Sequence, residues 1–323
     1  MSITFYRDQL KNEQARAFYD AICDRILDGD WSGEYPLRFT DRNTAAQDAF
    51  DAARAIRYDR PDFFFVGKAK RALVQRDQIV LSLNVLYKPQ DIEIISVLLE
   101  HRLDQLTEGT AGLPEWERER MIYDRLVRHL RYRNHSTDDM ANVHDHNVVC
   151  PLYAGSGVCE GFACLLTLAL RKAGIPCIRV DGVAGGGGHC WNMAWIEGSP
   201  VHLDLTWDNC FFRETSAYAY FNLTDEQISR DHQIETEGLP RCSDPTKSYH
   251  HRMGQAFSSV WDAARFLLQA FLRSRGPHSI RLDFDCDVED AVKRIMGLTP
   301  LIFYQYQCIP RQGAVLLWRG WRD

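Results

Sequence analysis

The spacing of apolar residues along the chain predicts helices in four early segments. Apolar side chains recur there every three to four positions, the period that places them on one face of an amphipathic helix. These segments are 12–28, 44–57, 90–106 and 115–131. Residues 79–87 instead alternate apolar and polar side chains, which predicts a half-buried strand, and Arg76-Asp77 can turn a hairpin before it.

The middle of the chain holds its most regular apolar pattern. In GVCEGFACLLTLALRKAG, apolar residues recur at i, i+3, i+4, i+7 and i+8 from Phe162, and Gly174 supplies the stop of a helix that opens near Cys159. Three strands are predicted after this helix, in the segments CIRVDGV, HCWNMAWI and VHLDLTW. The glycine run 185–188 between the first two is expected to form a flexible loop.

The last part of the chain predicts a small α/β unit of its own. A helix at 258–272, a strand around 280–284 and a helix at 288–296 are followed by two strands, LIFYQYQCI and AVLLWRG. The polar segment 241–255 is the candidate boundary before this unit. We therefore expect a mainly helical region over 1–115, a central α+β region over 116–250 and the α/β unit over 251–323.

Composition and charge narrow the classes of partner. The 323 residues carry a formal net charge of -6, so no basic field would draw the chain onto a phosphate backbone or an anionic membrane. No segment has the apolar length of a membrane span or the apolar centre of a cleaved signal peptide. A cytoplasmic protein that binds neither nucleic acid nor membrane is expected, with a specialised secretion route left open.

The ten cysteines are scattered without a C-x-x-C pair, which argues against a zinc ribbon or a redox dithiol. Most are expected to be small buried side chains in a reducing compartment. His135, His144 and His146 lie near three aspartates, but an exposed polar loop explains this composition better than a metal site does. No cofactor or metal is expected.

Cys159 has the surroundings of a nucleophile. A helix N-terminus carries partial positive charge and unpaired N–H groups, which stabilise a thiolate. Small residues precede it, Gly155-Ser156-Gly157, and would let a carbonyl group approach. The Cys159 N–H could then donate to the developing oxyanion.

A thiol nucleophile needs a base, and the base needs an orienting acceptor. His189 follows four glycines at the start of a predicted strand. On the next strand, alternation places Asp204 on the face opposite the core, where it is the natural partner of His189. Thr206 and Asp208 share that face, and a longer turn would bring one of them into register instead.

Three blocks of this sequence, taken in order, resemble the transglutaminase-like superfamily. They are GVCEGFACLLTLALRKAGIPC, GGHCWN and VHLDLTWD, and the likeness extends to YDRLVRHLRY upstream and YFNLTDEQISRDH downstream, over about 120 to 232. Members carry Cys, His and Asp in this order on a helix and two successive strands. The resemblance, of the bacterial transglutaminase-like cysteine peptidase type, implies a papain-like α+β core within 116–250, with the Cys-bearing helix packed on an antiparallel sheet.

Carried onto this sequence, the resemblance makes Cys159 the nucleophile, His189 the general base and Asp204, rather than Asp208, the orienting acid. Asn147 and Tyr153 are candidates for the oxyanion side chain, and Trp191 is expected to shape the cleft around the histidine. The implied chemistry is acyl transfer or hydrolysis at an amide of a protein or peptide through a thioester, leaning to a peptidase. The alternative is a catalytically idle transglutaminase-like module that binds a protein partner.

Overall fold

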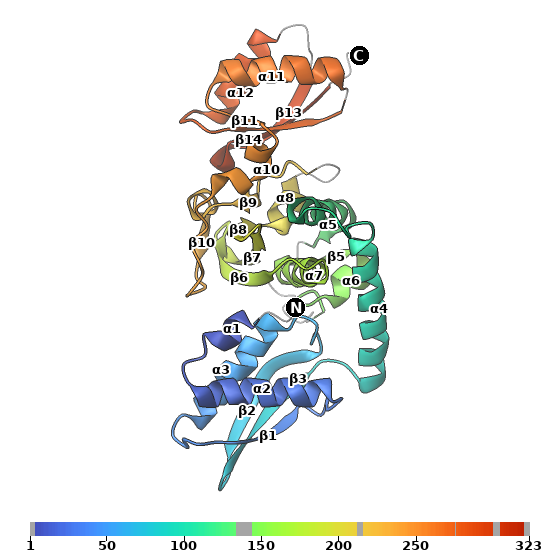
Figure 1. The fold of residues 1–323 in the computed structure, drawn as a ribbon, viewed down its shortest axis with the longest axis vertical. Coiled ribbons are helices and arrows are strands. Elements are labelled where there is room, and N and C mark those ends of the chain that lie inside the picture. Colours follow the sequence, from blue (N-terminus) through green and yellow to red (C-terminus); the bar gives the residue numbers. More distant parts are fainter. Residues whose placement is uncertain (1–3, 134–143, 212–215, 275, 300–303, 320–323) are drawn as a thin grey trace. The chain divides into compact units, whose positions relative to one another are not determined.

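The computed structural model describes residues 4–133, 144–211, 216–274, 276–299 and 304–319. The chain divides into two compact units, whose helices and strands are labelled in Figure 1. One comprises Met1–Ile122 and Arg133–Arg179, and the other Tyr123–Tyr132 and Val180–Asp323. Each unit mixes helices with antiparallel strands, so the predicted α+β class is confirmed. Within the described ranges, no helix combines the length and the apolar composition that crossing a bilayer requires.

A three-stranded antiparallel sheet and two helices build the first half of the first unit. The strand order is β1-β3-β2, and α2 and α3 pack together beside the sheet. The elements are α1 (Phe5–Asp8), α2 (Glu13–Leu27), β1 (Glu34–Arg38), α3 (Ala45–Asp59), β2 (Val66–Val74) and β3 (Gln78–Val85). Val74 pairs with Ile79 across the predicted Arg76-Asp77 turn, which confirms the hairpin.

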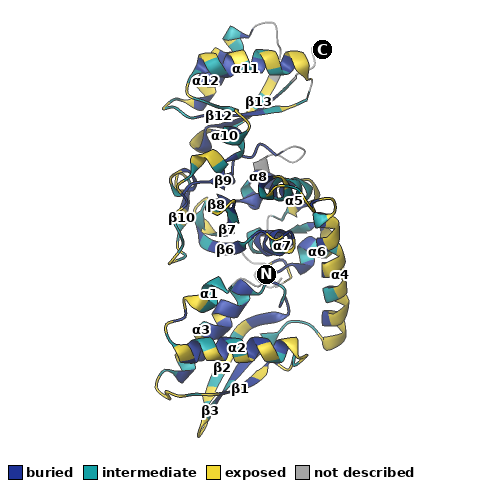
Figure 2. Ribbon diagram, in the orientation of Figure 1, coloured by how far each residue is buried: buried dark blue, intermediate teal, exposed yellow. Residues whose placement is uncertain are grey.

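The second half of this unit is helical. Its elements are α4 (Pro89–Thr107), the start of α5 (Glu115–His129), α6 (Val149–Ala154) and α7 (Cys159–Lys172). α7 packs against α4 and α6, and Figure 2 shows it as one of the most deeply buried helices. Gly161 in its first turn is required by close packing, because a Cβ there would lie 2.7 Å from the carbonyl oxygen of Asp145 and 2.8 Å from that of Asn147.

A five-stranded sheet with the order β10-β6-β7-β8-β9 forms the centre of the second unit. Its strands are β6 (Cys177–Ala184), β7 (Gly187–Ile196), β8 (Ser199–Leu203), β9 (Phe221–Leu223) and β10 (His232–Ile234). Gly185 and Gly186, with φ of 61° and 82°, form a two-residue turn between β6 and β7. Positive φ at both positions is the requirement of a type I′ hairpin, so a tight turn replaces the predicted flexible loop.

β8 is shorter than predicted. The strand ends at Leu203, and the residues that were expected to continue it form the helix α8 (Leu205–Phe211). The cause is Asp204, whose Oδ1 accepts a hydrogen bond of 3.0 Å from the backbone N–H of Trp207. This is the contact by which an aspartate caps a helix N-terminus, and it turns the chain out of the sheet.

The C-terminal part of the second unit is a four-stranded sheet, β11-β12-β14-β13, with two helices packed on it. The predicted order of helix, strand, helix and two strands is confirmed. The elements are α10 (Tyr249–Arg252), β11 (Ala256–Phe257), α11 (Val260–Arg273), β12 (His278–Leu282), α12 (Val288–Leu298), β13 (Tyr304–Ile309) and β14 (Ala314–Arg319). The short helix α9 (Asp225–Ile228) lies between β9 and β10 of the central sheet.

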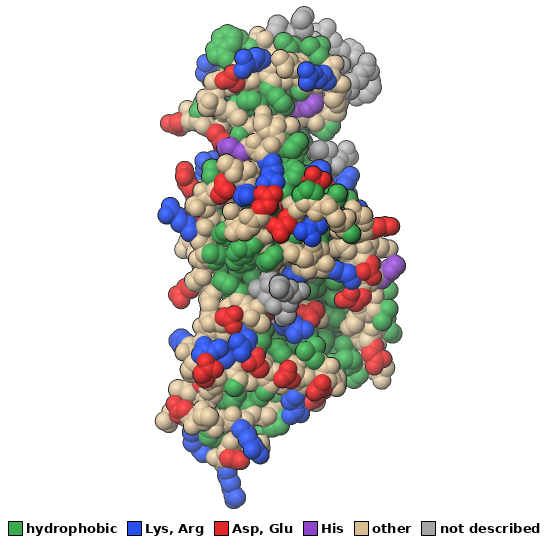
Figure 3. Space-filling view, viewed as in Figure 1, with side chains coloured by type: hydrophobic (Ala, Val, Ile, Leu, Met, Phe, Trp, Pro, Cys, Tyr) green, Lys and Arg blue, Asp and Glu red, His purple; other side chains and the backbone are tan. Residues whose placement is uncertain are grey.

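Charged side chains of both signs are mixed on the face of the molecule that Figure 3 shows. On that face, Lys and Arg are interspersed with Asp and Glu and do not gather into one basic patch. This fits the net charge of -6.

All nine cysteines whose side chains are described are free thiols.

Candidate active site

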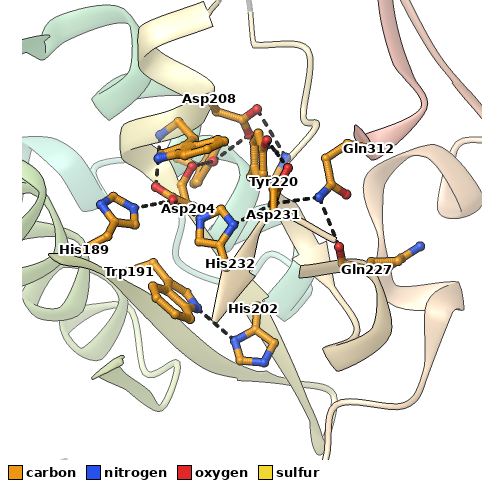
Figure 4. Close-up of polar contacts among 12 residues, drawn as sticks. His189, Trp191, His202, Asp204, Asp208, Tyr220, Gln227, Asp231, His232 and Gln312 are labelled. Carbon is orange, nitrogen blue, oxygen red and sulfur yellow. Dashed lines mark hydrogen bonds and ion pairs between the residues drawn. The ribbon is translucent and has the colours of Figure 1, made fainter. Parts of the chain in front are cut away.

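Asp204 lies at the centre of a hydrogen-bond network in the second unit (Figure 4). It follows β8, and His189 lies near the start of the neighbouring strand β7. The Nε2 atom of His189 is 2.6 Å from Oδ2 of Asp204, and Asp204 is fully buried. The sequence-predicted histidine and aspartate are therefore brought together.

Asp208, the alternative that strand alternation left open, has other partners. Its carboxyl group accepts hydrogen bonds from the hydroxyl of Tyr123, at 2.7 Å, and from the backbone N–H of Ala219, at 2.9 Å. Asp208 lies one helical turn beyond the cap of α8, which separates its role from that of Asp204. The carboxylate that contacts His189 is Asp204.

Asp204 is held as an anion. Burial alone would raise its pKa, but the charge of His189 and the hydrogen bonds from His189 and His232 hold the pKa below its usual range. An ionised carboxylate is acceptor-only, so the His189 Nε2 must donate its hydrogen to it. The neutral imidazole then has its lone pair on Nδ1.

His232 is a member of the network that sequence reasoning missed. From β10, its Nε2 lies 2.9 Å from the same Oδ2 of Asp204, and its Nδ1 lies 2.6 Å from Oδ1 of Asp231. Asp231 also accepts from the hydroxyl of Tyr220 at 2.8 Å. The signal in the sequence was the last residue of YFNLTDEQISRDH, which carried part of the family resemblance.

Trp191 forms the wall beside His189. The two rings stack with centroids 6.0 Å apart and planes 19° apart, and Trp191 is 1% exposed. Its indole N–H donates to Nδ1 of His202 at 3.1 Å, so the hydrogen of neutral His202 is on Nε2, which faces Asp225 at 3.0 Å. Trp191 therefore packs directly beside His189.

Cys159 belongs to the first unit, where it is the first residue of the fourteen-residue helix α7. Its side chain is partly exposed. The next residue, Glu160, contacts three cationic groups: Arg179 at 2.7 Å, His146 at 3.1 Å and Arg57 at 3.6 Å. Burial would raise the pKa of Glu160, but the hydrogen bond with His146 and the charge of Arg179 lower it to about 2.

The two oxyanion candidates also lie in the first unit. Asn147 is buried, and its amide donates to the hydroxyl of Tyr87 at 3.1 Å and accepts from the backbone N–H of Val149 at 2.9 Å. These bonds hold the loop that lies against Gly161. Tyr153, in α6, is 54% exposed.

Among the residues that the structure describes, two groups of side chains have the donor types of a metal site: His189, Asp204 and His232, and His202, Asp225 and Cys242. Two ligands on one tetrahedral zinc, each about 2.0–2.1 Å from it, lie about 3.3 Å apart. The separations of 2.6 and 2.9 Å around Asp204 are those of direct hydrogen bonds. In the second group, Nε2 of His202 carries a hydrogen, which it can donate to Asp225. Hydrogen bonding therefore explains why the side chains lie close together in both groups.

The polar loop with three histidines gives no metal group among its described residues. His135 lies outside them, as do Asp138 and Asp139. His144 is bonded to the hydroxyl of Tyr87 at 2.6 Å, and His146 to Glu160. Each ring therefore has a protein partner.

A cavity of about 410 Å³ lies beside Glu160 in the first unit. Its apolar lining comes from the segment that follows α3 and from the end of the β3 strand, and cationic side chains complete it. The apolar residues are Phe63, Phe64, Val66 and Leu86, and the cationic ones Arg57, Arg60, Lys68 and Arg179.

Residues 103–205 match the family model of the transglutaminase-like superfamily. This stretch is therefore similar to members of that superfamily. It contains Cys159, His189 and Asp204 in the order that the resemblance assigns to nucleophile, base and acid. A comparison with curated proteins finds no match to the chain.

Solved structures similar to this chain include a transglutaminase (TGase), with 13% identity, a TM-score of 0.32 and coverage of 54% of this chain and 50% of that one. A candidate cysteine protease from Cytophaga hutchinsonii shows 18% identity and a TM-score of 0.28 over 40% of this chain and 52% of that one. A candidate protease from Parabacteroides distasonis shows 16% identity and a TM-score of 0.28 over 41% and 30%. The chain thus spans about half or less of these proteins.

Proposed function

We propose that this protein is a cysteine enzyme that cleaves or transfers acyl groups at amide bonds, with Cys159 as nucleophile, His189 as general base and Asp204 as orienting acid. The observation that carries the proposal is the 2.6 Å bond from His189 Nε2 to the buried carboxylate of Asp204, within a segment that matches the transglutaminase-like superfamily. A triad base needs this orienting bond, because it fixes the ring and its tautomer.

The chemistry follows from the tautomer of His189. Its Nδ1 takes the proton of the Cys159 thiol, and the thiolate attacks an amide carbonyl carbon. The charge that develops on the carbonyl oxygen is stabilised by N–H groups at the start of α7. Nδ1 then returns the proton to the leaving amine, and a thioester remains on Cys159.

Water or an amine resolves the thioester. With water the enzyme is a peptidase or deamidase, and with an amine it is a transglutaminase. We favour peptidase chemistry on a protein or peptide, the substrate class that the family resemblance implies.

The test is incubation of the protein with a proteome, followed by mass spectrometry. The wild-type protein is expected to generate new peptide termini that are absent with Cys159→Ala and with His189→Ala. Cys23→Ala is the matched control, because Cys23 is a buried thiol in the helix α2 and its substitution should leave the products unchanged. Deamidated products would indicate a deamidase, and cross-linked products would indicate a transglutaminase. Identical proteomes after incubation with the wild-type protein and with Cys159→Ala would support the catalytically idle binding module.

A further inference from the structure

His232 lies between two buried carboxyl groups. Its side chain is fully buried, and each of its ring nitrogens faces one carboxyl oxygen, Nε2 that of Asp204 and Nδ1 that of Asp231. Three aromatic rings surround it, with centroids 4.7 Å away for Trp207, 5.1 Å for Trp191 and 5.5 Å for Tyr220.

The hydrogen bonds of the two aspartates decide the protonation of this ring. Asp204 receives hydrogens from His189 and from the backbone of Trp207. Asp231 receives hydrogens from the hydroxyl of Tyr220 and from the amide of Gln312, the latter at 3.1 Å. Both carboxyl groups are surrounded by donors, so both are acceptors, and a ring between two acceptors must donate from both nitrogens.

We propose that His232 is a buried imidazolium cation and the positioning residue of the site, which fixes Asp204 Oδ2 against His189. This rests on the proposed function. Burial would lower the pKa of His232, but the bonds to Asp204 and Asp231 raise it above its usual value, in agreement with the geometry. The titratable side chains that contact the ring, among the described residues, are Asp204, Asp231, His189 and Tyr220. His202 on β8 is also close enough for the charge of His232 to lower its pKa.

Charge balance gives the cation a role in the reaction. Two carboxylates and one imidazolium leave one negative charge in the buried network while His189 is neutral. When His189 takes the thiol proton, the network holds two anions and two cations and becomes neutral. His232 also repels the positive charge on His189, whose ring centroid is 5.5 Å away, so it keeps the pKa of that base from rising.

The first measurement is nuclear magnetic resonance of the full-length protein labelled with ¹⁵N-histidine. His232, assigned by its loss in His232→Gln, is expected to show two protonated ring nitrogens at about pH 8, well above the ordinary histidine pKa of about 6.5. Asp231→Asn removes one carboxylate with little change of shape, and the ring is expected to become neutral at that pH. A neutral His232 at pH 7 in the wild-type protein would overturn the proposal.

The second measurement is the pH profile of Cys159 alkylation. His232→Gln is expected to slow alkylation roughly tenfold, and to raise the apparent pKa of His189 by about one unit because a neighbouring cation is lost. A purely structural role would lower the rate by the same factor at every pH, and an unshifted profile would contradict the proposal. Should His232→Gln fail to fold, Asp231→Asn serves in its place.

His278→Gln is the matched control. His278 lies on β12, where its ring packs edge-on against Phe271 with centroids 4.7 Å apart, so the profile should not move. The two proposals fail differently, because the ring-nitrogen measurement does not depend on the reaction. A doubly protonated His232 together with an unreactive Cys159 would contradict the proposed function but still support the proposal that His232 is a cation.

Discussion

Asp204 and Asp208 are both fully buried and lie four residues apart, yet their surroundings shift the pKa values in opposite directions. Two imidazole rings bond to Asp204, and they hold its pKa below the usual range against the effect of burial. Around Asp208 the partners are neutral hydrogen-bond donors, and burial raises its pKa to about 7. Neighbouring charge decides which carboxyl group is the permanent anion.

The raised pKa of Asp208 predicts a pH-dependent stability. An unfolded aspartate titrates near 3.9, so between about pH 4 and pH 7 the folded state binds this proton more tightly than the unfolded state does. The contribution of Asp208 to the free energy of unfolding is therefore present below pH 4 and declines by up to about 1.4 kcal/mol per pH unit as the pH rises towards 7.

Asp208→Asn removes this titration and keeps an acceptor for the backbone N–H of Ala219. Urea unfolding at about pH 5 and pH 8 is expected to show that the variant gains stability relative to wild type as the pH rises, by at least about 1 kcal/mol. A difference between the two proteins that is constant with pH would show that Asp208 is ionised throughout.

At the scale of elements, β10 carries His232. This side chain reaches Asp204 because the neighbouring strand β6 leaves room for β10 to pack closely against it. A Cβ on Gly182 of β6 would lie 2.0 Å from the carbonyl oxygen of Gln233 and 2.8 Å from the ring of Trp191. Only glycine fits between the strand that carries His232 and the indole that stacks on His189. The site thus depends on one small residue in a strand interior.

Gly182→Ala is expected to displace β10, to cost roughly 2 kcal/mol or more of stability, and to disturb the bond between His232 and Asp204. Thermal unfolding and the histidine ring resonances measure the two effects. Gly187→Ala is the matched control in the neighbouring strand, since a Cβ there meets nothing within 4 Å. Equal behaviour of the two variants would refute this account of the packing.

The elements also show how far sequence reasoning reached. The 3.6-residue period predicted α7 and placed Cys159 at its start, because that helix has a long apolar face. Strand alternation failed after Leu203, where the side chain of Asp204 caps α8, since a capping bond leaves no periodic signal. β1 was missed because Pro36 and the charged residues beside it give the weak apolar pattern of an exposed strand, whereas β2 was implied only by the predicted hairpin.

The sequence likewise predicted some residues of the candidate site and missed others. The order of the sequence motifs singled out His189 and Asp204, and a hydrogen bond joins these two side chains in the structure. The position of His232 depends on the pairing of β10 with β6, a contact between residues about fifty positions apart. A single sequence has no local pattern from which a contact between such distant residues can be predicted.

At the scale of the whole molecule, the C-terminal sheet supports the network in its own unit. Arg281 on β12 is fully buried and donates to the carbonyl oxygen of Ala219 at 2.8 Å, and Ser279 donates to that of Ala217 at 2.6 Å. Gln312 donates to Asp231. The segment that carries Tyr220 and the aspartate beside His232 are thus both held by residues outside the central sheet.

The rate of Cys159 alkylation as a function of pH, followed by peptide mapping, tests the central claim most directly. At about pH 6 an ordinary thiol, with a pKa near 8.5, reacts slowly, whereas an activated one reacts as a thiolate. Cys150 and Cys286 are internal references, because both are partly exposed and burial raises the pKa of each.

The account predicts that Cys159 is labelled selectively at about pH 6, that His189→Ala abolishes the selectivity and that Asp204→Asn weakens it. Labelling of Cys159 as slow as that of the reference thiols, or selectivity that survives His189→Ala, would contradict it.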